Sequence, residues 1–540
     1  MNPFAKTILA AVATIISAAH ISSAADLRIV AGATHTPVLL DRADNILFNI
    51  RIDAPEGGTF ERLDLQLDKE SARYVRSVKL YYSGTDAVNV AADKLAATRY
   101  ILDGAREADP SYSILKAERR AAEHLSLAAP TSLFRGINYF WVSVEMRRDT
   151  PLTHKLAATL TTVTVDGRAA APEMLVATEA PRRMAVGVRH AGDDGSAAFR
   201  IPGLVTTARG TLLAVYDVRY NNSKDLQEHI DIGLSRSVDG GRTWQRMRLP
   251  LCFGCHDGLP AAQNGAGDPA ILYDPVTHRA WVVAAWCHGM GNRMAWHSSK
   301  SGMEPAVTGQ LVMAYSDDDG KTWSEPINVT RQVKRPEWNF LLQGPGRGIA
   351  MKNGTIVFAA QYIDAERMPH ACILYSDDHG RSWRLHEGAR SNTTEAQVAE
   401  LPSGDLMLNM RDNRGGSRAV SVTSDMGRTW TEHPSSRKAL REPVCMASLI
   451  SVAADENASG RDILLFSNPD CDNARRDITV KISFDGGATW PEGNKVLLDA
   501  GDGWGYSCLT MIDNRTVGIL YESSQAHMTF QAIPLTDLLP

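Results

Sequence analysis

Side chains able to bind an anion and to transfer protons recur between residues 200 and 522 of the chain. The first is Arg200, in the motif Phe-Arg-Ile-Pro, and further arginines and carboxylic acids follow it. Guanidinium groups form paired hydrogen bonds with carboxylates, so several arginines meeting at one point would select an acidic ligand. Because an edge-strand arginine before a proline would explain Arg200 equally well, this motif alone decides nothing.

An eight-residue repeat indicates how residues so far apart in the chain can meet. Each copy has Ser or Thr first, Asp third, Gly fifth and Trp eighth. The copies start at residues 237, 316, 376, 423 and 483, so the gaps between them are 79, 60, 47 and 60 residues. Such spacing is typical of propeller blades with about four strands each. Inner strands of successive blades converge on one axis, which would bring distant residues together.

The aspartates of the repeat are expected to brace turns and not to catalyse a reaction. Each copy follows a strand-like segment such as residues 230–235, which places it in a hairpin turn. There the carboxylate accepts hydrogen bonds from turn N–H groups, glycine adopts a positive φ, and tryptophan covers the apolar side of the blade.

The first part of the chain predicts a separate antiparallel β-sandwich with a linker, over residues 26–180. Alternating apolar residues occupy 46–52, 75–82, 139–146 and 160–165. Residues 168–183 lack periodicity and are rich in Ala, Pro and Arg, which indicates the linker. Tyr81, Tyr82 and Trp141 would stack on sugar if exposed, whereas burial on the alternating face explains them as readily.

The repeat is similar to the Asp box of the sialidase family and of other propellers, including some that are not enzymes. Further motifs, however, follow one another in the order found in sialidase catalytic domains, over residues 184–540. In this order they carry Arg200, Arg219 with Asp225, Asp268, Glu395, Arg411, Arg475, Tyr506 and Glu522. Arg476 is adjacent to Arg475, and the spacing to the fifth repeat favours Arg475.

The resemblance implies an all-β protein, in which a six-bladed propeller at residues 181–540 follows the small sandwich. It also implies a bacterial exo-α-sialidase that removes terminal sialic acid with retention of configuration, through a covalent tyrosine adduct. Five repeats for six blades leave one blade without the motif.

The same resemblance implies a role for each site residue. An arginine triad would hold the carboxylate of the sugar, with Glu522 supporting Arg200, while Arg219 and Asp268 would also bind substrate. Tyr506 would be the nucleophile, Glu395 its base, and Asp225 the group that protonates the leaving oxygen or activates water. The triad is Arg200, Arg411 and Arg475.

Three rival functions remain open from the sequence. A sialic-acid lectin would keep the arginines but has no use for Asp225, Glu395 and Tyr506. A structural propeller would keep the repeats and lose the arginines. A transferase acting at the same site is not excluded by any residue.

Residues 1–25 resemble a signal peptide, because Lys6 precedes an apolar run and Ser23-Ala24-Ala25 precedes Asp26. We therefore expect export to the periplasm, the cell surface or the medium, without an integral membrane segment after cleavage. The expected partners are sialylated glycans. A net charge of −5 gives no global attraction for nucleic acid.

The seven cysteines are few for an exported chain and odd in number, so disulfides are not expected to hold the fold. Cys252-Phe253-Gly254-Cys255-His256 matches a haem-attachment signature, but its Pro- and Gly-rich surroundings favour a chance match or a local disulfide. No metal-binding motif is present, and we expect no cofactor. Trp286, His288, Trp296 and His297 would line a pocket or pack in the core, and no role is assigned to them.

Overall fold

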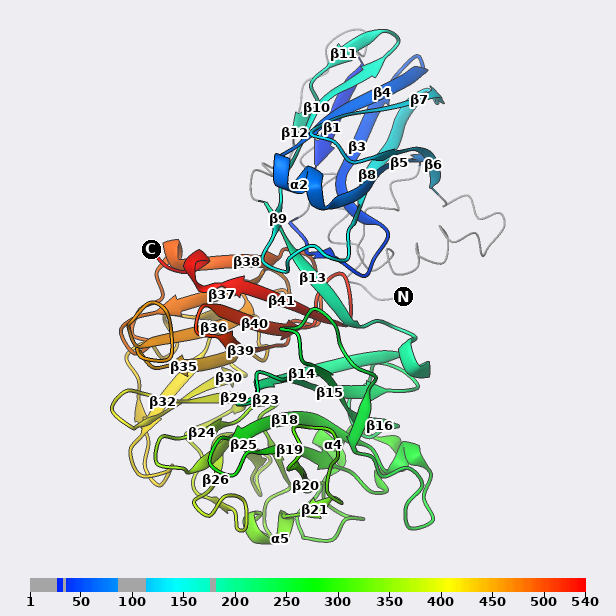
Figure 1. Cartoon of the computed structure of the whole chain (residues 1–540). Helices are drawn as coiled ribbons and strands as arrows, with labels where there is room; N and C mark the ends of the chain where they lie inside the picture. Colours follow the sequence, from blue (N-terminus) through cyan, green and yellow to red (C-terminus); the bar gives the residue numbers. More distant parts are fainter. Residues whose placement is uncertain (1–26, 33–34, 86–112, 175–180) are drawn as a thin grey trace.

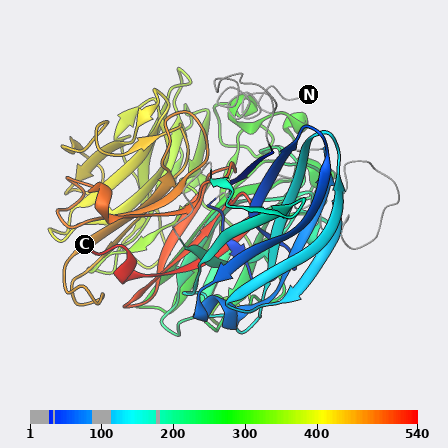
Figure 2. The same ribbon diagram turned by 90° about the horizontal axis from the view of Figure 1, so that it is seen from above.

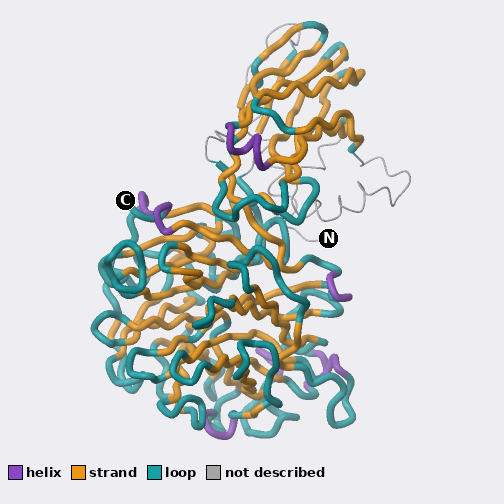
Figure 3. Tube along the Cα trace, in the orientation of Figure 1, coloured by secondary structure: helices purple, strands orange, loops and turns teal. Residues whose placement is uncertain are grey.

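The computed structural model describes residues 27–32, 35–85, 113–174 and 181–540, so the expected signal peptide lies outside the described residues. Strands dominate the described chain, and the helices are short (Figure 3). The α-helices of the described residues are α2 (Lys69–Tyr74), α4 (Ala295–Ser298) and α5 (Thr330–Val333), and the other helical segments are single 3-10 turns. Figure 1 shows a smaller β unit at the top and a larger one below it.

The smaller unit is a sandwich of two mainly antiparallel sheets around one apolar core, as predicted. Phe60 of one sheet stacks on Phe140 of the other, with ring centroids 4.4 Å apart. The first sheet has the order β12 (Glu173–Met174), β1 (Arg28–Gly32), β3 (Asn45–Ala54), β8 (Gly136–Met146), β5 (Val75–Gly84) and β6 (Ile114–Arg120). The second has the order β11 (Arg168–Ala170), β10 (Ala158–Val165), β4 (Gly58–Leu67) and β7 (His124–Leu133).

Two expectations for this unit require correction. Tyr81, Tyr82 and Trp141 are between 2% and 7% exposed, so burial accounts for them and they do not offer a face to sugar. The predicted linker at 168–183 is also only partly irregular. Its first residues pair as β11 with β10 and as β12 with β1, and its last residues begin the propeller strand β13 (Arg182–Arg189).

The larger unit consists of six four-stranded blades, which agrees with the predicted propeller. Figure 2, seen from above, shows the blue and cyan strands of the sandwich in front of this larger unit. The first blade contains β14 (Ala198–Thr206), β15 (Leu212–Arg219), β16 (Ile230–Ser237) and β17 (Arg248–Leu251). The second contains β18 (Ala266–Asp274), β19 (Arg279–Trp286), β20 (Gln310–Ser316) and β21 (Ile327–Asn328). The third contains β22 (Phe340–Gln343), β25 (Ile356–Ile363), β26 (Pro369–Ser376) and β27 (Arg384–Leu385). The fourth blade contains β29 (Thr393–Glu400), β30 (Leu406–Asp412), β32 (Ala419–Thr423) and β33 (Thr431–Glu432). The fifth contains β35 (Ser448–Val452), β36 (Ile463–Pro469), β37 (Ile478–Ser483) and β38 (Lys495–Asp499). The sixth contains β39 (Ser507–Asp513), β40 (Thr516–Tyr521), β41 (Met528–Pro534) and, as its fourth strand, β13.

Short strands extend these sheets at their edges and ends. Gly346–Arg347 forms β23, which runs parallel to β18. β24 (Ile349–Ala350) and β28 (Arg390–Ser391) extend the third blade, whereas β31 (Gly416–Ser417) and β34 (Arg441–Glu442) form a separate two-stranded sheet.

Every repeat lies in the hairpin between the third and fourth strands of a blade, and its aspartate braces the turn as expected. In the second blade, Asp318 accepts hydrogen bonds from the Ser316 hydroxyl at 2.9 Å and the Thr322 hydroxyl at 2.7 Å. The backbone N–H groups of Lys321 and Thr322 also donate to it. The equivalent aspartates are Asp239, Asp378, Asp425 and Asp485.

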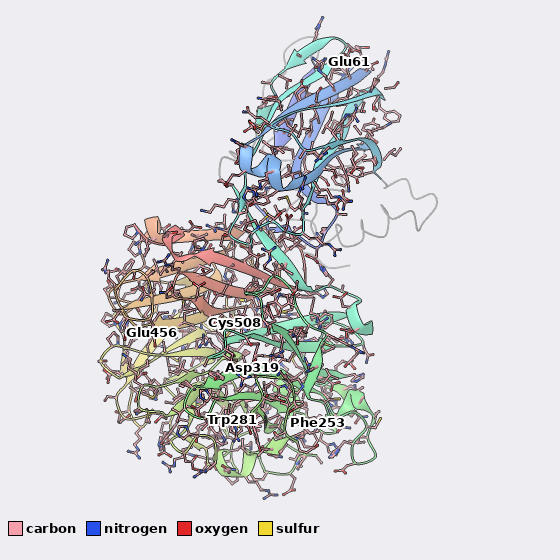
Figure 4. All side chains as sticks on the ribbon, in the orientation of Figure 1. Glu61, Phe253, Trp281, Asp319, Glu456 and Cys508 are labelled. Atoms are coloured by element: carbon pink, nitrogen blue, oxygen red, sulfur yellow. The ribbon has the colours of Figure 1, made fainter. Side chains whose placement is uncertain are left out.

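The glycine of each repeat also permits close contact with the preceding blade. A Cβ at Gly380 would lie 2.2 Å from the ring of Trp281, and one at Gly241 would lie 1.9 Å from the ring of Phe530. Asp319, labelled with Trp281 in Figure 4, adds a polar link between blades, because its carboxylate accepts from Thr207 and Arg236 of the first blade. The turns therefore connect blades as well as strands.

The sixth blade closes the ring and carries the sandwich. Its outer strand β13 comes from the start of the propeller and pairs with β41 from the end of the chain. The same β13 pairs with β2 (Val38–Leu39) and β9 (Lys155–Leu156) of the amino-terminal part. Asp537 accepts from Lys155 and Arg183 at 2.8 and 2.7 Å, which fixes the junction further.

We predict that Asp318→Ala lowers the free energy of unfolding by about 1–2 kcal/mol, because four hydrogen bonds of the turn are lost. Partial burial raises the pKa of Asp318, but hydrogen bonds from Thr322 and Ser316 outweigh it and lower the pKa to about 2. This contribution is therefore present above the unfolded pKa of about 3.9 and is lost as pH falls towards 2.

The measurement is thermal unfolding of both proteins between pH 7 and pH 3. Asp317→Ala is the matched control, since Asp317 is 57% exposed and forms a surface ion pair with Arg279 worth little. Equal losses of stability in the two variants would contradict the bracing role.

Candidate active site

The predicted site residues gather where the innermost strands of several blades begin. Arg200, Asp268 and Glu395 lie near the starts of β14, β18 and β29, and Tyr506 immediately precedes β39. Cys508, two residues after Tyr506, is labelled in the interior of the propeller in Figure 4. The ends of the second strands meet the same region and supply Arg219, Arg411 and, just after β40, Glu522.

Glu522 is fully buried and connects the first blade with the sixth. One carboxylate oxygen accepts from Arg200 Nε at 2.7 Å and from the backbone N–H of Ile201 at 2.9 Å. The other accepts from the backbone N–H of Tyr506 at 3.0 Å. One carboxylate thus fixes an arginine side chain and the main chain that carries the tyrosine.

The hydroxyl of Tyr506 lies among the arginines and donates a short hydrogen bond to Glu395. Arg411 Nη1 donates to the same Glu395 at 2.6 Å and to the Tyr506 oxygen at 3.1 Å. The guanidinium carbons of Arg200 and Arg475 lie 5.5 and 5.6 Å from the centre of the Tyr506 ring. The structure therefore brings all three predicted triad arginines to one tyrosine.

The loops around Tyr506 decide which arginine reaches it. Arg475 donates to the backbone oxygen of Trp504 at 3.1 Å, whereas Arg476 is exposed and lies 3.6 Å from Asp477. Gly505 has a φ of +90°, and a Cβ there would lie 3.0 Å from the Cβ of Arg475. Glycine therefore lets the tyrosine loop pass directly over Arg475.

A second cluster joins the first two blades. Arg219 is 1% exposed and binds Asp217 through Nε and Nη2, at 3.0 and 2.8 Å. Its Nη1 donates to Asp225 at 2.8 Å. Asp217 also accepts from the backbone N–H of Asp268 at 2.8 Å, where the backbone has a positive φ of 60°. Arg219 is thus shared between a buried carboxylate and Asp225, whose side chain is 58% exposed.

The surroundings give these ionisable groups different proton affinities. Burial, and next the charge of Glu395, raise the pKa of the Tyr506 phenol well above its ordinary value. Burial, followed by Asp217 and Asp225, raises the pKa of Asp268 well above the usual range. Burial also raises the pKa of Asp225, but Arg219 and Arg200 together outweigh it, so the net pKa is lowered. Tyr506 therefore keeps its proton and Asp225 is charged at neutral pH, while Asp268 is shifted towards its protonated form.

Sequence reasoning missed the contribution of two residues at this site. The sequence assigned no role to Asp217, although it fixes both Arg219 and the Asp268 backbone. Trp504 lies under Arg200, with the guanidinium carbon 4.8 Å from its ring centre. Alternation along β15 places Asp217 and Arg219 on the same side of the strand, which was a usable signal.

The cysteine motif lies apart from these contacts and forms no disulfide. All seven cysteines are unpaired, and both Cys252 and Cys255 are exposed. Cys252 donates to Asp231 at 3.3 Å. The alternative of a local disulfide is therefore wrong for this structure. Trp286 is 6% exposed and stacks on Phe253 at 4.5 Å, so packing accounts for it.

Comparison with known proteins identifies the family of the chain. The family described as the N-terminal domain of BNR-repeat neuraminidase matches residues 27–169, and the BNR repeat-like domain family matches residues 210–520. Together with the propeller and its arginine cluster, these matches define a glycoside hydrolase of the neuraminidase type.

Full-length relatives narrow this class. A sialidase of Bacteroides fragilis is 57% identical over 513 residues, covering 94% of each chain. The solved structure of the Hadza microbial sialidase Hz136 is 54% identical, with a TM-score of 0.88, and covers 95% of this chain and all of that one. The fold is also similar, at 20% identity and a TM-score of 0.52, to Trypanosoma rangeli sialidase, covering 67% of this chain and 56% of that one. The chain belongs to the sialidase family.

The buried ion pair of Arg200 and Glu522 yields a prediction. Glu522→Ala leaves Arg200 buried without its counter-charge, and we expect a loss of about 3–5 kcal/mol in the free energy of unfolding. We also expect weaker substrate binding, because Arg200 and the Tyr506 main chain lose their common anchor.

Denaturant unfolding and the KM for a fluorogenic sialoside are the two measurements. The exposed Glu456, labelled in Figure 4, provides the control variant Glu456→Ala. A stability loss no larger than that of the control would refute the role given to this pair.

Proposed function

We propose that the protein is an exo-α-sialidase that hydrolyses terminal α-linked sialic acid from glycoproteins, glycolipids or oligosaccharides with retention, through a covalent Tyr506 adduct. The observation that carries the proposal is the contact of the Tyr506 hydroxyl with both Glu395 and Arg411, beside Arg200 and Arg475. A lectin has no need for a tyrosine paired with a base.

The arginines are suited to the carboxylate that sialic acid carries on its anomeric carbon. Arg200, Arg411 and Arg475 gather at Tyr506, and a cluster of guanidinium groups favours a carboxylate over a neutral sugar. Among the described residues, Arg411 Nε is buried without a hydrogen-bond partner, so a donor is left for a ligand. The raised pKa of Asp268 favours its protonated form, which would donate to a polar group of the sugar.

Tyrosine is a suitable nucleophile because it is neutral before reaction. A carboxylate nucleophile would be repelled by the carboxylate next to the carbon under attack, and sialidases are known to use tyrosine instead. In the first step Tyr506 Oη attacks the anomeric carbon, and its proton passes to Glu395. Asp225 protonates the departing oxygen, and the aglycone leaves.

In the second step water attacks the anomeric carbon and replaces Tyr506. Asp225 takes a proton from that water, and Glu395 returns its proton to the tyrosine oxygen. Both carboxyl groups are then back in their starting states, so the cycle balances without a metal or a cofactor.

Substrate binding itself would prepare Asp225 as an acid. In the free protein Arg219, Arg200 and Arg475 lower the pKa of Asp225. A bound carboxylate would neutralise the field of Arg200 and Arg475, so the pKa of Asp225 would rise and the group would gain its proton. The acid is then protonated mainly when a sialoside is present.

The wider proposal is that the protein acts outside the cytoplasm on sialylated glycans, without nucleic acid as a partner. Residues 1–25 would be the cleaved signal peptide, 26–180 a carbohydrate-binding-like sandwich with its linker, and 181–540 the catalytic unit. Among the described residues, no helix has the length and apolar character needed to cross a membrane.

We predict that Tyr506→Phe lowers kcat for an aryl sialoside by at least about a thousandfold, since the nucleophile is lost. The unsubstituted protein should gain the mass of one 3-fluorosialyl unit at Tyr506, with release of fluoride, from 2,3-difluorosialic acid, the compound present in the T. rangeli covalent-intermediate complex. Tyr521→Phe is a matched control, because Tyr521 is fully buried away from the arginines and bonds Gln531.

NMR of the first product formed should show the α-anomer, as retention requires. Turnover of Tyr506→Phe at the rate of the unsubstituted protein would disprove the nucleophile assignment. Sialyl transfer to added lactose in place of hydrolysis would assign the site to a transferase.

Asp217→Asn should shift the pH dependence of kcat. The carboxylate of Asp217 partly neutralises the Arg219 guanidinium. Without that negative charge, Arg219 attracts the Asp225 carboxylate more strongly, which lowers the pKa of Asp225. We expect the basic limb of the profile to move to lower pH by roughly half to one unit. Asp257→Asn, at a side chain that is 74% exposed, is the control. An unchanged basic limb would show that Asp217 has only a structural role.

A further inference from the structure

The sandwich contains a cleft lined almost entirely by arginines. Its volume is about 540 Å³, and its lining residues are Arg76, Arg120, Arg147, Arg148 and Asp149. The cleft belongs to neighbouring strands of one sheet, because β5 pairs with both β6 and β8. Arg76 lies near the start of β5, Arg120 ends β6, and Arg147 follows the last residue of β8.

The charges in this cleft are poorly balanced within the protein. Arg76 forms an ion pair with Glu145 at 2.8 Å, although its side chain is 71% exposed. Across the described parts of the chain, no carboxylate lies within ion-pair distance of Arg120, Arg147 or Arg148. All three are exposed, so their guanidinium groups are accessible to a ligand.

The first blade adds another cation at the same place. Arg242, in the first Asp box, is exposed and donates to the backbone oxygen of Arg148 at 3.2 Å. The cleft therefore lies at the junction with the propeller. Since the whole chain has a net charge of −5, the concentration of arginines here is a local reversal of the average charge.

We propose that this cleft binds an anionic glycan, with sulfate or carboxylate groups on neighbouring sugars. Guanidinium forks bind both groups in a bidentate manner, and several forks in a row match several anions along a chain. The cleft is shallow and open to solvent, so an extended glycan chain can lie across it.

The inference rests on the proposed function, because the substrate glycans of that function carry such acid groups. A second attachment point would hold the glycan near the propeller after each cleavage and raise the effective concentration of its remaining ends. The cleft would thus retain polymeric substrate and leave the reaction on small sialosides unchanged.

Binding is tested in the Tyr506→Phe background, so that the ligand is not consumed. The probes are a sulfated mucin stripped of sialic acid, polysialic acid without sulfate, and neutral dextran. We expect the double variant Arg120→Ala/Arg147→Ala to bind the anionic probes at least tenfold more weakly, with a reduced dependence on salt. Whichever anionic probe binds identifies the acid group that the cleft takes.

The matched control is Arg119→Ala/Arg135→Ala. Arg119 precedes Arg120 in β6 and lies outside the cleft, and Arg135 is an exposed residue of the same unit. This control removes the same charge, so we expect binding within twofold of the parent. If the first double variant does not fold, Arg120→Lys/Arg147→Lys keeps the charge without the forks and should weaken binding severalfold.

Equal weakening by both alanine pairs, no weakening by either, or equally tight binding of duplex DNA would overturn the proposal. Hydrolysis of a small sialoside by the same variants with Tyr506 intact is a separate readout. It should be unchanged in both pairs, because none of the four arginines belongs to the active site. If the unsubstituted protein does not hydrolyse the small sialoside at all, that result counts against the proposed function and not against the cleft.

Discussion

The buried carboxylate of Glu522 is the constraint on which the active site depends. It holds the Arg200 guanidinium and the backbone N–H groups of Ile201 and Tyr506 at the same time. These groups belong to the first and sixth blades, so the interaction spans the seam where the ring closes. A charge this deeply buried is tolerated because each oxygen has donors, one of them cationic. The geometry of the tyrosine is therefore tied to closure of the propeller.

Closure also explains why six blades contain five Asp boxes. The box occupies the hairpin between the third and fourth strands of a blade. In the sixth blade the third strand, β41, lies near the end of the chain, and the fourth, β13, comes from before the first blade. No hairpin joins them, so no turn exists for an aspartate to brace. That blade is instead supported by β2, β9 and the contacts of Asp537 with Lys155 and Arg183.

The sequence was informative wherever one local rule determined the structure. Turn chemistry predicted the role of Asp318, and period-2 alternation located the strands of the sandwich. Contacts between distant blades were not predictable in the same way. Asp217 is an unremarkable strand residue until the fold brings the Asp268 backbone to it. Residues 168–174 appear as a linker because edge strands of two or three residues are too short to show periodicity.

Two aspartates of the site show how burial and charge together shift proton affinities. Burial beside Asp217 raises the pKa of Asp268, whereas the neighbouring arginines lower the pKa of the more exposed Asp225. Arg219 cannot neutralise both neighbours fully, because it already binds Asp217 through two nitrogens and reaches Asp225 with the third. Any anion that occupies the arginine cluster must therefore raise the proton affinity of Asp225. In this arrangement ligand charge and acid strength are coupled through the guanidinium groups, which requires no movement of the backbone.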